Sequence, residues 1–153
     1  MRVLAVDHGE RRIGLAISDP TGRLARPLTV VAHMSRAIDA ARVSDAAREQ
    51  CAGLIVIGQS FDEEGRPNAA GRRAERFAEA LKSRTAIPIV LWDESMSTQD
   101  ARQARLAAGA GRKRRWTAVD AEAAAIILQS YLEARRAPTR EEMVPPAERR
   151  DEE

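Results

Sequence analysis

The sequence predicts a single α/β domain in which helices flank a mixed sheet of five strands. Short apolar runs rich in β-branched residues alternate with longer segments whose charges recur at helical spacing. The first three runs are joined by short turns, which is typical of an antiparallel meander. The later runs are separated by helical segments, which is typical of right-handed βαβ crossovers between parallel strands.

Each element has its own local signal. Polar turns end the first two strands, Ser35 is a suitable N-cap for the first helix, and the fourth strand is fully apolar, as in a buried parallel strand. The expected strands are 3–7, 13–17, 28–31, 54–57 and 88–92, and the expected helices are 35–50, 68–84, 98–108 and 118–136.

The charge distribution separates a domain from a tail. The whole chain has a formal net charge of +2, which sums +5 over residues 1–136 and −3 over residues 137–153. The tail also contains Pro138, Pro145 and Pro146 among dense charges. We therefore expect a folded domain over 1–136 and a disordered, charged tail over 137–153.

Composition excludes several classes of protein. No apolar run approaches the roughly 20 residues of a membrane span, and the first residues lack the segments of a signal peptide. Cys51 is the single cysteine, which excludes an internal disulfide or a Cys-rich zinc site, and we expect it in the core. Aromatic residues make up only 3% of the chain, which disfavours a base-stacking single-strand binder. These features favour the cytoplasm and predict no membrane partner.

Three acidic residues are candidates for one site. Asp7 ends the first strand, Glu94 follows the fifth, and Asp120 lies near the start of the last helix. We expect them to converge at the carboxyl edge of the parallel strands, where α/β sites form. Clustered carboxylates raise one another's pKa unless a cation neutralises them, and oxygen ligands suit Mg²⁺ or Mn²⁺. Two such ions, with Asp7 as the bridging ligand, would support phosphodiester cleavage.

Each acid also has an ordinary structural interpretation. Asp7 is a suitable turn residue, and Asp93 with Glu94 is compatible with a solvated loop. Asp120 lies three residues after Thr117, the spacing of a capping box. The metal-site interpretation therefore depends on the joint placement of the three acids.

Basic residues indicate a phosphate-containing partner. We expect five of them to contact nucleic acid: Arg12, Arg112, Lys113, Arg114 and Arg115. The alternative is that they form a solvated charged surface. The charged segment 60–73 has the composition of a mobile flap over the site or of an ordinary surface loop. His8 is interpreted as a turn residue that is also within reach of the site.

Three motifs resemble those of the YqgF/RuvX family. They are the segments 7–16 (DHGERRIGLA), 93–98 (DESMST) and 119–131 (VDAEAAAIILQSY). The resemblance covers about residues 2–135. It implies an RNase H-like fold with strand order 3-2-1-4-5 and strand 2 antiparallel. It also implies metal-binding, catalytic acids at Asp7, Glu94 and Asp120, and we expect Thr98 to support Glu94.

The sequence departs from the family pattern at three places. An aromatic or apolar residue commonly follows the first Asp, where this chain has His8. The usual Arg after Asp-Glu is Ser95, and the usual Gly-Leu-Pro after the fourth strand is Gly58-Gln59-Ser60. None of these differences removes a carboxylate, so they concern substrate contacts more than catalysis.

The combined expectation is a metal-dependent nuclease of the two-metal type. By the resemblance, its role is to process the 5′ end of the precursor of 16S ribosomal RNA (pre-16S rRNA). The expected partners are structured RNA, branched DNA or ribosomal particles, and the expected state is a monomer or weak homodimer. The alternatives are a Holliday junction resolvase, which needs a dimer, and a non-catalytic RNA-binding factor in ribosome assembly.

Overall fold

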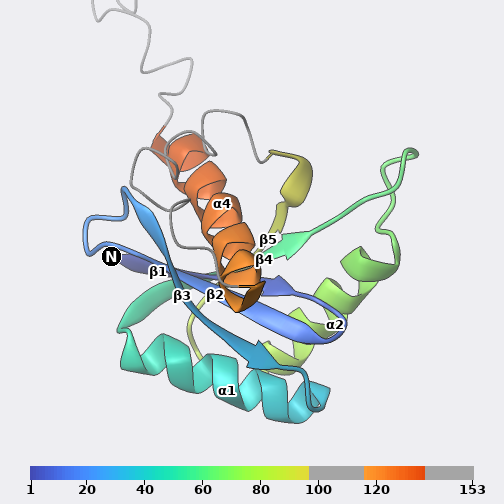
Figure 1. Ribbon diagram of the computed structural model, residues 1–153, viewed down its shortest axis with the longest axis horizontal. Coiled ribbons are helices and arrows are strands. Elements are labelled where there is room, and N and C mark those ends of the chain that lie inside the picture. The colour runs from blue at the N-terminus through green and yellow to red at the C-terminus, as the bar shows by residue number, and fades with distance from the viewer. Residues whose placement is uncertain (97–115, 137–153) are drawn as a thin grey trace, which may run out of the picture.

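The computed structural model describes residues 1–96 and 116–136, and they form a five-stranded sheet with helices on both faces (Figure 1). The elements are β1 (Arg2–His8), β2 (Arg12–Ser18), β3 (Ala25–Ala32), α1 (Arg36–Glu49), β4 (Ala52–Gln59), α2 (Ala69–Lys82), β5 (Ile89–Asp93), the 3₁₀ turn η1 (Glu94–Met96) and α4 (Trp116–Arg136). The strand order is β3-β2-β1-β4-β5. β2 runs antiparallel to β1 and β3, and β1, β4 and β5 are parallel, so the predicted topology is confirmed.

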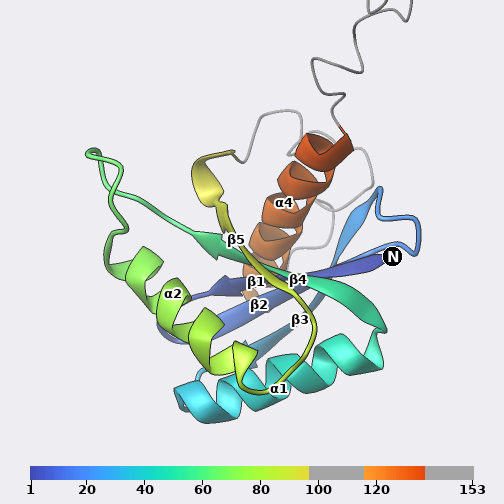
Figure 2. The same ribbon diagram turned by 180° about the vertical axis from the view of Figure 1, so that it is seen from behind.

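The sheet separates two hydrophobic layers. α4 covers one face, and α1 and α2 cover the other (Figures 1 and 2). Successive side chains of a strand point to opposite faces. Val3 and Ala5 of β1 therefore pack under α4, whereas Leu4 and Val6 pack against the α1 and α2 layer. This alternation decides on which face each polar residue at the end of β1 lies.

The helix starts follow the expected capping chemistry. The Ser35 side chain accepts a hydrogen bond from the amide of Ile38, and Asn68 caps α2 by accepting one from the amide of Gly71. Each side chain satisfies an amide that the first helical turn leaves unpaired. The predicted helix 98–108 and the tail 137–153 lie outside the described residues.

Cys51 corrects one expectation. It is exposed rather than in the core, and it has a φ of 55° directly after the cap residue Gln50. This left-handed conformation closes the end of α1, a position that glycine usually occupies. Within the part of the chain that the structure describes, no helix combines the length and apolarity that crossing a membrane requires.

Candidate active site

Three elements bring the predicted acids to the carboxyl edge of the parallel strands. Asp7 lies near the end of β1, and the alternation along that strand places it on the face covered by α4. Glu94 begins η1 directly after β5, two strands from β1 in the sheet. Asp120 lies in the described first turns of α4. The structure therefore places all three acids at this edge of the sheet, and their role as metal ligands stays a prediction.

Electrostatics shows that these carboxyl groups act on one another. The pKa of Asp7 is raised to about 6, first by burial and then by the negative charges of Glu94 and Asp120. The pKa of Glu94 is also raised, by burial and by the neighbouring charge of Asp93. Both shifts mean that the ionised forms are unfavourable without a compensating positive charge.

Two glycines, to which the sequence analysis assigned no role at the site, allow this close approach. Gly14 lies opposite Asp7 in the β1–β2 ladder, and a Cβ atom there would lie 2.1 Å from the carbonyl oxygen of Asp120. A Cβ atom on Gly58 of β4 would lie 2.9 Å from Oε1 of Glu94. A glycine inside a strand is a signal of close approach by another group, and it was available in the sequence.

Arg12 contacts the acid cluster directly. Its Nε atom lies 3.3 Å from Oδ2 of Asp120, and both side chains are partly exposed. The capping-box alternative for Asp120 depends on the side chain of Thr117, which is not among the described side chains.

A cleft of about 640 Å³ extends from Glu94 toward the segment between β4 and α2. This segment is a hairpin with a bridge between Phe61 and Pro67, and it projects from the sheet (Figure 1). The predicted flap 60–73 was too long, since residues 69–73 belong to α2. The hairpin side of the cleft carries Asp62 and Glu63, so its walls are acidic.

The family departures have structural roles in this chain. Nε2 of Gln59 donates to Oε1 of Glu75 at 2.7 Å, and the Ser60 hydroxyl donates to the Asn68 side chain at 2.7 Å. These bonds attach the end of β4 to α2. The backbone amide of Ser95 donates to Oδ1 of Asp93 at 2.9 Å, which shapes the turn that presents Glu94.

His8 does not have the role expected from the sequence. It is the last residue of β1 rather than a turn residue, and its ring stacks on Phe77 of α2 with centroids 4.5 Å apart. It therefore points away from the acid cluster, to the opposite face of the sheet. Burial is the main cause that lowers the pKa of His8.

The remaining predicted site residues have no described position. Thr98 and the four basic residues of the run 112–115 lie outside the described ranges. Their proposed roles therefore remain predictions.

A family model matches the chain over residues 1–134, and its description is RuvX, Holliday junction resolvase. The chain belongs to the RuvX family. A relative of this RuvX chain from Anaeromyxobacter sp. (strain Fw109-5) is 42% identical over 137 residues, which cover 90% of this chain and 100% of the relative. Another, from Thermoanaerobacter pseudethanolicus, is 35% identical over 137 residues, with 89% and 99% coverage. Both are named as candidate pre-16S rRNA nucleases.

Solved structures similar to this RuvX chain share its fold. Thermus thermophilus RuvC in complex with a Holliday junction substrate has a TM-score of 0.62 at 19% identity, covering 88% of this chain and 95% of that chain. The fowlpox virus Holliday junction resolvase has a TM-score of 0.52 at 16% identity, with 88% and 99% coverage. At these identities the likeness concerns the fold alone, and it confirms the expected RNase H-like architecture.

The donor set of the RuvX site fits a hard divalent cation. Asp7, Glu94 and Asp120 offer only carboxylate oxygens, which Mg²⁺ and Mn²⁺ prefer. The raised pKa of Asp7 is a second observation that favours a cation, because it shows that the ionised carboxylate lacks a compensating positive charge. A bound cation would supply that charge.

Proposed function

We propose that this protein is a metal-dependent nuclease that hydrolyses phosphodiester bonds at the 5′ end of pre-16S rRNA. The observation that carries the activity is the convergence of three carboxylates from β1, η1 and α4 on one sheet edge. The substrate is proposed from the relatives, which share 42% and 35% identity with this chain over almost their full lengths.

We assign different roles to the three acids. The negative charges of Glu94 and Asp120 both raise the pKa of Asp7, so Asp7 is the proposed ligand shared by two ions. Glu94 and Asp120 would each complete one side of the site.

The proposed cofactor is Mg²⁺ or Mn²⁺. When bound, two such ions supply the positive charge that lowers the pKa of a water molecule and stabilises the leaving oxygen of a phosphodiester. The chain itself holds and orients the ligands. Gly14 and Gly58 leave room for Asp120 and Glu94, and Thr98 is the proposed support of Glu94.

Substrate binding requires cationic groups beside this acidic edge. Arg12 already lies at the edge through its contact with Asp120, and it would turn to a phosphate when cations neutralise the carboxylates. The basic residues 112–115 are the proposed further phosphate contacts. Precursor ribosomal RNA and ribosomal particles would place the protein in the cytoplasm, as a monomer or weak homodimer. We propose that residues 1–136 suffice for this activity.

Cleavage of three end-labelled substrates tests this function. The full chain is incubated in Mn²⁺ with pre-16S RNA containing the 5′ leader, single-stranded RNA of unrelated sequence, and a four-way DNA junction. We expect cleavage of the precursor at one leader position and slower, unspecific cleavage of the unrelated RNA.

The other outcomes would replace the proposal. Paired, symmetric cuts in the DNA junction, together with dimers in sedimentation, would identify a resolvase, the activity in the description of the family model. Binding of precursor RNA that persists without divalent ions and never leads to cleavage would identify a ribosome-assembly factor.

A further inference from the structure

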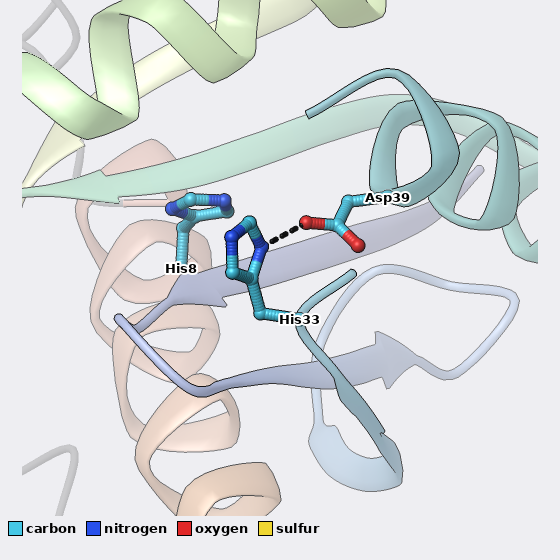
Figure 3. Close-up of side chains that lie close together, drawn as sticks. All are labelled: His8, His33 and Asp39. Carbon is cyan, nitrogen blue, oxygen red and sulfur yellow. Dashed lines mark hydrogen bonds and ion pairs between the residues drawn. The ribbon is translucent and has the colours of Figure 1, made fainter. Parts of the chain in front are cut away.

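A second group of potential metal ligands lies on the opposite face of the sheet. His8 ends β1, His33 follows β3, and Asp39 lies in the first turn of α1 (Figure 3). One ligand atom from each residue lies within 4.8 Å of the other two. The group is separate from the three carboxylates, because His8 and Asp7 are neighbours in a strand and point to opposite faces.

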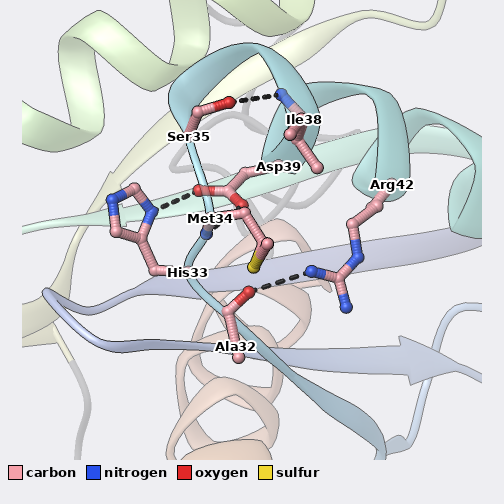
Figure 4. Close-up of polar contacts among 7 residues, drawn as sticks. All are labelled: Ala32, His33, Met34, Ser35, Ile38, Asp39 and Arg42. Atoms are coloured by element: carbon pink, nitrogen blue, oxygen red, sulfur yellow. Dashed lines mark hydrogen bonds and ion pairs between the residues drawn. The ribbon is translucent and has the colours of Figure 1, made fainter.

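Local hydrogen bonds fix the connection from β3 to α1. The Ser35 side chain caps α1 by accepting from the amide of Ile38 (Figure 4), and the amide of Asp39 donates to the carbonyl of Ser35 at 2.8 Å. The amide of Met34 donates to Oδ1 of Asp39 at 3.0 Å, and Nη1 of Arg42 donates to the carbonyl of Ala32 at 2.9 Å. The second carboxylate oxygen of Asp39 contacts Nδ1 of His33. Two of the three ligands are therefore already oriented, Asp39 by the amide of Met34 and His33 by the carboxylate of Asp39.

His8 adds the observation that points to a ligand. Both of its ring nitrogens are buried, and neither reaches a hydrogen-bond partner on another described residue. The ring is held between Phe77, on which it stacks, and His33, whose ring lies edge-on with centroids 6.2 Å apart. Buried polar atoms are usually paired, and an unpaired one destabilises the folded state. A metal ion bound to one nitrogen would satisfy it.

We propose that His8, His33 and Asp39 bind one divalent transition-metal ion of the zinc class. Two imidazole nitrogens and one carboxylate are common ligands of Zn²⁺, which is usually four-coordinate, whereas Mg²⁺ prefers oxygen ligands alone. An adjoining cavity of about 220 Å³, lined by His8 and His33, has room for water as the fourth ligand. Binding through Nδ1 of His33 needs this nitrogen without a proton, which the tautomer protonated at Nε2 provides.

The charged residues around the cavity influence its affinity for a cation. Arg36, Arg73 and Arg76 line it and oppose a cation. Glu10 also lines it and pairs with Arg73 at 3.4 Å, and the buried Asp39 carboxylate contributes a negative charge. The same arginines would attract an anion, so an anion bound without a metal ion is the alternative ligand of this cavity.

The metal would connect the end of β1 to the start of α1, directly behind Asp7. This role does not rest on the proposed function, because it concerns ligands on the other face of the sheet. A structural ion here would stabilise the strand that carries Asp7.

Titration of Zn²⁺ into the full chain tests the proposal. The protein carries no polyhistidine tag, and excess Mg²⁺ is present so that hard-cation sites on carboxylates are occupied. The variants are His8→Phe, which keeps the stacking on Phe77, and His33→Ala, which removes a side chain that is 37% exposed and belongs to neither hydrophobic cluster. We expect one ion per wild-type chain and an affinity at least about tenfold weaker in each variant.

Three matched variants control for Zn²⁺ binding elsewhere and for the charge of the cavity. Cys51→Ser removes the only thiol, Asp7→Asn changes the carboxylate site, and Arg36→Ala removes a cavity charge without removing a ligand. All three should retain the wild-type Zn²⁺ affinity or exceed it. Because His33 is partly exposed, His33→Ala keeps the test valid if His8→Phe does not fold.

Two results would overturn the proposal. The first is Zn²⁺ binding that is absent or equal in wild type, His8→Phe and His33→Ala. The second is inorganic phosphate binding without Zn²⁺ that weakens in Arg36→Ala, which would identify an anion site. The Zn²⁺ titration involves no nucleic acid, so its results can be interpreted even when the cleavage assay above fails.

Discussion

Nε of Arg12 lies 3.3 Å from Oδ2 of Asp120, so a cation of the protein itself occupies part of the carboxylate edge. The contact joins β2 to α4 across the site. It places one guanidinium where a metal ion and a phosphate are both proposed to bind.

Replacing Arg12 by Gln should therefore have opposite effects on two ligands. Mn²⁺ affinity should rise by about two- to fivefold, because an exposed ion pair of about 0.2–1 kcal/mol no longer competes for Asp120. Affinity for RNA should fall, and the slope of its salt dependence should decrease by about one phosphate contact. Calorimetry with Mn²⁺ and filter binding at several salt concentrations measure both. Weaker Mn²⁺ binding in the variant would contradict this assignment.

Gly14 should be indispensable for the position of α4. In Gly14→Ala the new Cβ would meet the backbone of Asp120 at 2.1 Å, and a backbone atom in a packed helix yields only if the helix shifts. We expect a loss of about 1–3 kcal/mol in the free energy of unfolding, as for other overpacked sites, and weaker Mn²⁺ binding. Denaturant unfolding and calorimetry check both. Wild-type values for both quantities would show that α4 does not depend on this contact.

Gly58→Ala should act on metal binding more than on stability. Its Cβ would lie 2.9 Å from the side-chain atoms Oε1 of Glu94 and Cδ1 of Ile127, which are able to move. The fold should persist while Mn²⁺ affinity falls by about tenfold, because Glu94 loses its position. Gly53→Ala in the same strand is the matched control, since the atoms nearest to its Cβ belong to the Met1 side chain. Equal Mn²⁺ affinities in the two variants would refute the role of Gly58.

The pKa of Asp7 predicts how stability depends on pH without metal. Because this pKa is about 6 in the folded chain and 3.8 ordinarily, the folded state binds the proton more tightly than the unfolded state. The contribution of Asp7 to the free energy of unfolding is therefore full below about pH 4 and lost as pH rises to about 6. We expect a loss on the order of 1–3 kcal/mol across this window.

Asp7→Asn is the control for this pH dependence. Denaturant midpoints of the two metal-free proteins should be measured from pH 4 to pH 7. The variant should become the more stable protein toward pH 7, and saturating Mg²⁺ should restore the wild type. Parallel curves for the two proteins would mean that Asp7 is not destabilised by its neighbours.

The full strand order was implied by the family resemblance, whereas the carboxylate edge was predictable from local signals. Asp7 occupies the α4 face because its odd-numbered neighbours Val3 and Ala5 are apolar and small on that face. Convergence with Glu94 follows from parallel strands, whose carboxyl ends share one edge.

Other features depend on tertiary geometry that no local pattern contains. The same alternation that places Asp7 also turns His8 to the opposite face, but its contact with His33 requires the path of the chain from β3 into α1. Cys51 was misplaced because the apolar strand β4 follows it directly, whereas its φ of 55° ends α1 and exposes it. Gly14 and Gly58 were visible as strand glycines, but the groups that approach them come from distant segments.

The most direct test of the carboxylate site compares wild type and Asp7→Asn in Mn²⁺-dependent cleavage of pre-16S RNA. Initial rates are measured at saturating enzyme, and circular dichroism verifies that both proteins are folded. We predict that the variant retains RNA binding and loses cleavage by about 100-fold or more, because the ligand shared by the two proposed ions is gone. Cleavage by Asp7→Asn at the wild-type rate would contradict the central claim that this carboxylate edge is the catalytic site.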